Sequence, residues 1–205
     1  MDGNETLVFS KEAITVRENT TKRTAVMHSG ERSLMKKLAE IVTKNGGNIL
    51  EIGFGMHISA DYVQSNPAVT SHTIIEVHPE VYKSALDWAK DKPNTKIFLG
   101  DWIEVLPTLN VKFDGILHDT HRDKNIYKFL EFTKPVCNPG CTVGFFDYYV
   151  VDTRLNGVRH SLTKEEYESL PYKNSIGFIN NQFELKYTTF NGVNFYSNSN
   201  TNKIV

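Results

Sequence analysis

The stretch that decides the fold is Ile49-Leu50-Glu51-Ile52-Gly53-Phe54-Gly55-Met56-His57. It begins as a short apolar strand and runs into two glycines that allow a sharp backbone turn. In a doubly wound α/β sheet, such a turn at the carboxyl end of a strand lets a ligand approach the backbone closely. Because G-x-G alone is a weak signal, the stretch predicts a ligand site only if the surrounding chain has the pattern of that sheet.

The surrounding chain has this pattern. Short apolar, strand-like segments occur at residues 48–52, 73–77, 96–99, 113–117 and 142–146. Helical segments lie between them: residues 34–42 are apolar on one face and stop at Gly46-Gly47, and Pro79 opens another helix. The alternation predicts βαβ units and a parallel sheet. Asn138-Pro139-Gly140 predicts a turn that leads into the fifth strand.

The C-terminal part has a different texture. Residues 182–190 and 193–197 alternate between polar and apolar, and Asn191-Gly192 joins them, which is a strong hairpin signal. Thr163-Lys164-Glu165-Glu166 has the form of a capping box and predicts a further helix. We therefore expect an α/β sheet that is mostly parallel and ends in an antiparallel hairpin.

This organisation predicts one main domain at residues 25–197. A polar segment, residues 1–24, precedes it, and a polar tail, residues 198–205, follows it. Within the first segment, Leu7-Val8-Phe9 and Ile14-Thr15-Val16 predict short β pieces or a lid.

The composition narrows the choice of partner. The 205 residues are 40% hydrophobic, and 23 Lys+Arg against 24 Asp+Glu give a net charge of −1, which makes nucleic acid a poor candidate. There is no apolar run of about 20 residues and no signal pattern at the start, so we expect a cytoplasmic protein that does not bind membranes. Cys137 and Cys141 are too few for a disulfide framework or a zinc site and predict reduced thiols.

Polar residues follow the predicted strands at the edge where the glycine turn lies. Glu76 comes about 20 residues after the turn, where a carboxylate holds ribose hydroxyls. This suits nicotinamide cofactors and S-adenosylmethionine (SAM) alike, but Ile58 replaces the third glycine of a dinucleotide fingerprint and favours SAM. Asp101-Trp102 predicts an adenine contact, in which Asp101 accepts a hydrogen bond from the amino group and Trp102 stacks on the base. The alternative is that Asp101 caps a helix and Trp102 lies in the core. Asp119 would face the methyl group, whereas His118 and His121 are a weak metal signal.

At this point the sequence resembles the guanidinoacetate methyltransferases and the related arginine δ-N-methyltransferases. The resemblance covers about residues 25–120. It is carried by E-I-G-F-G-M at 51–56, H-T-I-I-E at 72–76, D-W-A at 87–89, G-D-W at 100–102, F-D-G-I-L-H-D-T at 113–120, and a segment at 26–35 similar to V-M-x-x-W-E-x-x-x-M.

The resemblance implies a Rossmann-like class I methyltransferase with a seven-stranded, mostly parallel sheet. It implies SAM as the cofactor, S-adenosylhomocysteine (SAH) as the product, no metal, and a monomer or homodimer. In the family two carboxylates, which correspond to Glu31 and Asp119, hold the guanidino group of a small cationic acceptor. This fits the chemistry of a guanidinium, which is planar, protonated and best held by carboxylates that also accept a proton.

Two sets of contacts follow. The expected cofactor contacts are Glu51, Gly53, Gly55, Met56, Glu76, Val77, Gly100, Asp101, Trp102 and Asp119. The expected acceptor contacts are Glu31, Asp119, His121, Asp147, Tyr148 and Tyr149, of which Asp119 and Glu31 are the catalytic candidates.

The chain departs from the family pattern at His57, Gly30 and His121, and in Phe146-Asp147-Tyr148-Tyr149, which replaces a loop similar to C-N-L-T-S. Asp147 would repel an acceptor carboxylate, so the acceptor stays open between guanidinoacetate-like and arginine-like molecules. Three alternatives remain: a divalent-metal O-methyltransferase with ligands Asp119 and Asp147, methylation of peptide or protein arginine, and a non-catalytic adenosyl-binding module.

Overall fold

A computed structural model describes residues 4–17, 23–121, 123, 129–146, 185–190 and 193–198. The strands are β1 (Leu7–Phe9), β2 (Ala13–Arg17), β3 (Arg23–His28), β4 (Gly47–Ile52), β5 (Val69–Glu76), β6 (Thr95–Leu99), β7 (Phe113–His118), β8 (Cys137–Phe146), β9 (Leu185–Phe190) and β10 (Val193–Asn198). The α-helices are α1 (Arg32–Val42), α2 (Ile58–Ser65), α3 (Pro79–Trp88), α4 (Trp102–Val105) and α5 (Phe129–Thr133). Short 3-10 turns are η1 (Ser29–Glu31), η2 (Ala89–Asp91), η3 (Leu106–Thr108) and η5 (Lys134–Val136). None of the helices in these ranges is long and apolar enough to cross a membrane.

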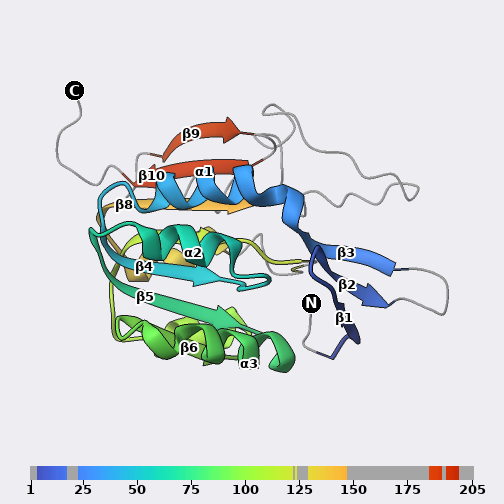
Figure 1. Cartoon of the computed structure of the whole chain (residues 1–205). Coiled ribbons are helices and arrows are strands. Elements are labelled where there is room, and N and C mark those ends of the chain that lie inside the picture. The colour runs from blue at the N-terminus through green and yellow to red at the C-terminus, as the bar shows by residue number, and fades with distance from the viewer. Residues whose placement is uncertain are drawn as a thin grey trace.

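The larger sheet has the strand order β6-β5-β4-β7-β8-β10-β9 (Figure 1). Its first five strands are parallel, which confirms the predicted parallel sheet. Strand β10 pairs antiparallel with both β8 and β9, and Val193 lies opposite Phe190, so the hairpin predicted around Asn191-Gly192 is confirmed.

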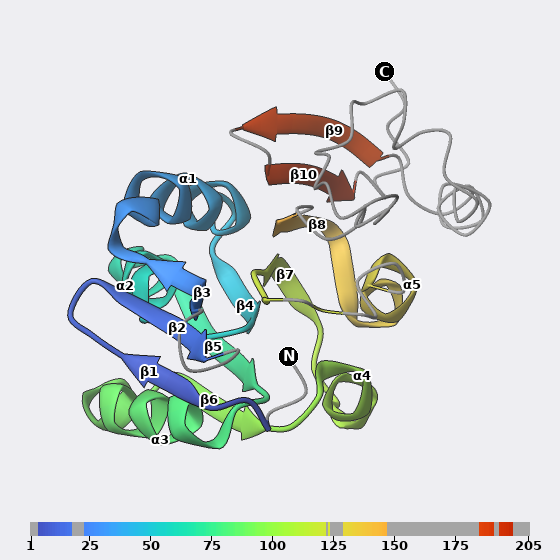
Figure 2. The same cartoon turned by 90° about the vertical axis from the view of Figure 1, so that its right-hand side faces the viewer.

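Helices cover both faces of this sheet, with α1, α2 and α3 on one side and α4 and α5 on the other (Figure 2). Adjacent residues of β7 show why, because successive side chains of a strand point to opposite faces. Leu117 packs with Leu38 of α1, whereas Ile116 packs with Trp102 and Phe129 on the other side. Both faces are therefore apolar, as a parallel sheet requires.

The prediction of a turn at Asn138-Pro139-Gly140 is wrong. These residues lie within β8, which begins at Cys137 rather than near residue 142. The β7–β8 register passes from Phe113↔Cys137 to Gly115↔Thr142, so β8 contains extra residues as a bulge. Gly140 has a φ of +83°, a left-handed conformation that glycine adopts in bulges as it does in turns. A proline has no N–H for strand pairing, so it too is found in bulges as well as in turns.

The N-terminal segment forms an antiparallel sheet of its own, with the order β1-β2-β3. It lies across the carboxyl ends of β4 and β5 (Figure 2). Leu7, Ile14 and Val16 share a core cluster with Phe54, which follows β4. The expected β pieces at 7–9 and 14–16 are confirmed, whereas β3 was not expected, and the predicted boundary at residue 24 falls inside it. The helix predicted from Thr163 lies outside the described residues.

Candidate active site

The turn after β4 is built so closely against its neighbours that only glycine fits. Gly53 has a φ of +89°, and a Cβ on it would lie 2.2 Å from the carbonyl oxygen of Asp119. Gly55 has a φ of +53°, and a Cβ there would lie 2.7 Å from Met27 Sδ. The same sulfur accepts a hydrogen bond from the backbone N–H of Met56 at 3.1 Å. This crowding fixes the path of the turn at the carboxyl end of β4, and the predicted contact of its backbone with a cofactor stays a prediction.

Glu76 lies beside this turn at the end of β5. Its Oε2 accepts the N–H of Phe54 at 2.9 Å, and its Oε1 accepts the N–H of His78 at 2.7 Å. Burial raises the pKa of Glu76, and these backbone hydrogen bonds, with the charge of His78, oppose that rise. Both oxygens of Glu76 thus fix the backbone around the turn, and its contact with ribose hydroxyls stays a prediction. Val77 lies between Glu76 and His78 and is partly buried.

Glu51, the acidic residue of the opening motif, is completely buried. Ser59 of α2 donates to its Oε1, and His72 Nε2 lies 2.8 Å from its Oε2. Gln64 Nε2 lies 3.3 Å from His72 Nδ1, so a Gln donor there leaves the His proton on Nε2, toward Glu51. Both oxygens of Glu51 thus hold the turn to α2 and β5, and a direct cofactor contact stays a prediction.

The loop after β6 forms a helix N-cap followed by a core tryptophan, which was the alternative to an adenine contact at Asp101-Trp102. Asp101 caps α4 by accepting the N–H of Ile103 at 3.0 Å. Trp102 is only 5% exposed, and its ring makes edge contacts with His118, Phe129 and Phe132. The predicted stacking of Trp102 on adenine does not fit this buried position. Gly100 donates its N–H to the carbonyl of Glu76 at 2.9 Å, which ties this loop to the end of β5.

The two catalytic candidates lie on separate elements that meet at the sheet edge. Asp119 follows β7 and donates its N–H to the carbonyl of Ile52 at 3.0 Å. Burial, then the negative charges of Glu31 and Glu51, raise the pKa of Asp119 to about 7. Burial also raises the pKa of Glu31, while the backbone and charge of His28 lower it. The influence of Glu31 on Asp119 shows that the structure brings the two carboxyl groups within electrostatic reach.

The remaining acceptor residues are placed only in part. His121 is 7% exposed in the loop after Asp119, whereas Asp147, Tyr148 and Tyr149 lie outside the described residues. Among the residues that the structure describes, no group of three His, Cys, Asp or Glu side chains could hold a metal ion. Sequence reasoning missed Met27 and Asp123. The position of Met27 in the segment 26–35 was a usable signal, but Asp123 had none.

The parallel sheet with its antiparallel hairpin, and the glycine turn at its carboxyl edge, give the chain the Rossmann-like class I methyltransferase fold. The chain belongs to the guanidinoacetate N-methyltransferase family, whose pattern matches residues 15–135.

Named relatives agree with this assignment, and a solved structure shares the fold. Protein arginine N-methyltransferase 2 of Yarrowia lipolytica is 30% identical over 158 residues, which are 72% of this chain and 30% of that protein. The protein of the same name from Saccharomyces cerevisiae is 29% identical over 161 residues, 73% of this chain and 38% of that protein. The chain thus spans about a third of the length of these relatives. The O-methyltransferase TomG from Streptomyces achromogenes, solved with SAM, has the same fold, with a TM-score of 0.60, 16% identity and coverage of 84% of this chain and 81% of that chain.

Proposed function

We propose that this chain transfers a methyl group from SAM to a guanidino nitrogen of a small, cationic, arginine-like or guanidinoacetate-like acceptor. The observation that supports this most is the pair Glu31 and Asp119: burial raises the pKa of Asp119, and the negative charge of Glu31 adds to that rise. Two carboxylates that repel each other form a site that a cation stabilises, because a positive charge between them favours both ionised forms. A guanidinium is planar and accepts two such partners side by side.

The residues at the sheet edge fit SAM. The backbone of Gly53 to Met56 would hold the methionine part, Glu76 the ribose hydroxyls, and Asp101 the adenine amino group. When bound, the cofactor supplies an electrophilic methyl group on its sulfonium. Glu31 and Asp119 orient one guanidino nitrogen, and Asp119 accepts the proton that this nitrogen loses as its bond to the methyl carbon forms. A pKa of about 7 suits that exchange near neutral pH.

A second acceptor class has its own support. The relatives are named protein arginine N-methyltransferases, and an arginine side chain in a polypeptide presents the same guanidinium as the free amino acid. A methyl-transfer screen separates the two. It compares arginine, agmatine and guanidinoacetate with arginine-containing peptides, and product mass identifies the methylated molecule.

The same screen includes a catechol and an EDTA arm, because Asp119 and Asp147 would be the ligands of a metal-dependent O-methyltransferase. We expect guanidine methylation that EDTA does not reduce. Loss of activity with EDTA, together with catechol methylation, would favour the metal-dependent enzyme.

Two variants test the acceptor carboxylates. We expect Asp119→Asn and Glu31→Gln each to lose at least about 100-fold in kcat/KM, since each removes a charge that orients the acceptor. SAH binding should stay within about threefold in Glu31→Gln, because Glu31 is not among the expected cofactor contacts. The matched controls are Asp87→Asn and Glu40→Gln, whose side chains are 73% and 53% exposed in helical ion pairs. If the site variants retain the activity of the controls, the proposed roles are wrong. If the wild type binds SAH yet methylates no guanidine, a non-catalytic adenosyl-binding module is favoured instead.

A further inference from the structure

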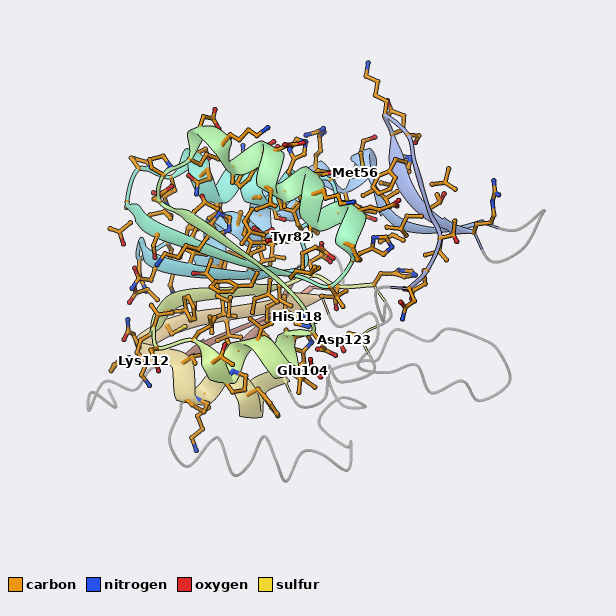
Figure 3. All side chains as sticks on the ribbon, turned by 90° about the horizontal axis from the view of Figure 1, so that it is seen from below. Met56, Tyr82, Glu104, Lys112, His118 and Asp123 are labelled. Carbon is orange, nitrogen blue, oxygen red and sulfur yellow. The ribbon has the colours of Figure 1, made fainter. Side chains whose placement is uncertain are left out.

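A buried carboxylate joins two loops of the candidate site. Asp123 Oδ2 accepts the indole N–H of Trp102 at 2.6 Å and lies 2.9 Å from His118 Nε2. Figure 3 shows His118 and Asp123 side by side. We call Trp102, His118 and Asp123 the bridging cluster.

The bridging cluster is well fixed. The side chains of His118 and Asp123 are 1% and 10% exposed, and Trp102 is 5% exposed. The rings of Trp102 and His118 meet edge-to-face at 5.7 Å, and Phe129 contacts both, at 5.8 Å and 4.6 Å. A carboxylate that accepts two hydrogen bonds with so little water nearby holds its donors more firmly than one at the surface.

The cluster lies next to Asp119 in the chain. Asp119 donates its N–H to the carbonyl of Ile52, and Asp123 lies against His118, the residue before Asp119. On the other side, Trp102 begins α4, whose N-cap Asp101 is the predicted adenine contact. The cluster therefore connects the acceptor side of the site with the adenine side.

We propose that Asp123 is a positioning residue of the methyl-transfer site, which fixes the Asp119 loop against the start of α4 and so aligns the acceptor carboxylate with the bound adenosyl group. This rests on the proposed function. Asp123 acts through His118, which precedes Asp119, and through Trp102, which follows Asp101.

The test compares Asp123→Asn with Asp114→Asn. Asp114 is a matched control because it lies near the start of β7, the strand whose other end leads to Asp123, and it accepts the N–H of Asn48 and an amide hydrogen of Asn138, each at 2.8 Å. We expect Asp123→Asn to lower kcat about tenfold or more and to weaken SAH binding about fivefold, because small displacements of an aligned group are costly. We expect Asp114→Asn to change both quantities by less than twofold, even if it lowers the melting temperature equally.

A spectroscopic readout does not depend on turnover. The chain has two tryptophans, so Trp88→Phe leaves Trp102 as the only fluorescent indole. In that background we expect SAH to shift the Trp102 emission, and we expect Asp123→Asn to abolish the shift. If Asp123→Asn does not fold, Trp102→Phe removes the indole donor together with part of the buried ring, and it should lower kcat and SAH affinity as Asp123→Asn does.

The outcomes separate the two proposals. If Asp123→Asn matches Asp114→Asn in kcat, SAH affinity and fluorescence response, Asp123 is only structural and the inference is overturned. If the wild type binds SAH but methylates no guanidine, the proposed function fails, and the SAH affinities and the fluorescence response of the variants still decide the role of Asp123.

Discussion

At the scale of single residues, Asp119 predicts how the activity depends on pH. Its pKa is raised to about 7 by burial and by the charges of Glu31 and Glu51, and only the ionised form holds a guanidinium. We expect kcat/KM for the acceptor to fall about tenfold per pH unit below about 7. Glu31→Gln should move this limb to lower pH, because one of the charges that raises the pKa is gone. A limb that does not move would show that Glu31 does not act on Asp119.

The same group predicts a pH dependence of stability. The folded pKa of Asp119 lies above its unfolded value of about 4, so the folded state binds the proton more tightly. Stability from this group is complete below about pH 4 and is lost as pH rises through about 7. Asp119→Asn removes that loss, so we expect it to gain stability relative to the wild type from pH 5 to pH 8 in urea denaturation. A constant difference would contradict the prediction.

Alanine variants at two glycines with similar backbone conformations separate the cost of left-handed strain from the cost of crowding. Gly53 and Gly140 have φ of +89° and +83°, but a Cβ on Gly140 would meet nothing within 4 Å. We expect Gly140→Ala to cost about 1–2 kcal/mol of unfolding free energy, from left-handed strain alone. Gly53→Ala should cost more and should weaken SAH binding, because the Cβ displaces the Asp119 carbonyl. Equal costs in both variants would show that the close approach is unimportant.

The residue scale also shows where sequence reasoning reaches its limit. Short-range patterns predict a turn at Gly53 and the end of a strand at Glu76, and the structure has both, whereas the cofactor contacts of the two residues stay predictions. Asp101-Trp102 fits two local structures equally well, and only the packing of Phe129 and Phe132 around the indole decides between them.

At the scale of elements, the N-terminal sheet predicts a difference between two neighbouring apolar residues. Ile14 of β2 is 3% exposed and packs in the cluster that contains Phe54, whereas Phe9 of β1 is 46% exposed. We expect Ile14→Ala to lose about 2–5 kcal/mol and to weaken SAH binding, because it leaves a cavity next to the turn after β4. Phe9→Ala, which removes a larger but exposed side chain, should change stability by less than about 1 kcal/mol. Equal effects would show that β2 does not support the turn.

The elements that the sequence predicts well are those with strong local signals. Strands β4 to β7 are apolar runs between helical segments, and α3 begins at a proline. The bulge in β8 was misread because Asn138-Pro139-Gly140 satisfies a turn and a bulge alike, and only the pairing with β7 distinguishes them. Strand β3 was missed because its pairing with β2 is not visible in its own residues.

At the scale of the whole molecule, the nearly neutral net charge does not reveal the local group of carboxylates at the candidate site. A net charge of −1 predicts little attraction for a polyanion, yet Glu31, Glu51 and Asp119 come from segments far apart in the sequence and concentrate negative charge at one edge of the sheet. No local sequence pattern shows that these three carboxylates lie near one another. The same holds for the contact of Asp123 with Trp102, which is 21 residues away in the sequence. The topology brings them together, because the carboxyl ends of parallel strands meet at one edge.

This shared edge predicts that the cofactor product stabilises the whole domain. The turn after β4, the end of β5 and the covering sheet β1-β2-β3 pack on one another, so SAH bound among them should oppose global unfolding. At 100 times its Kd, SAH should add about 2.7 kcal/mol and raise the melting temperature by about 5–10 °C. NADH at the same concentration is the control and should give no shift, since Ile58 stands where a dinucleotide site has its third glycine. A shift with NADH and none with SAH would contradict the choice of cofactor.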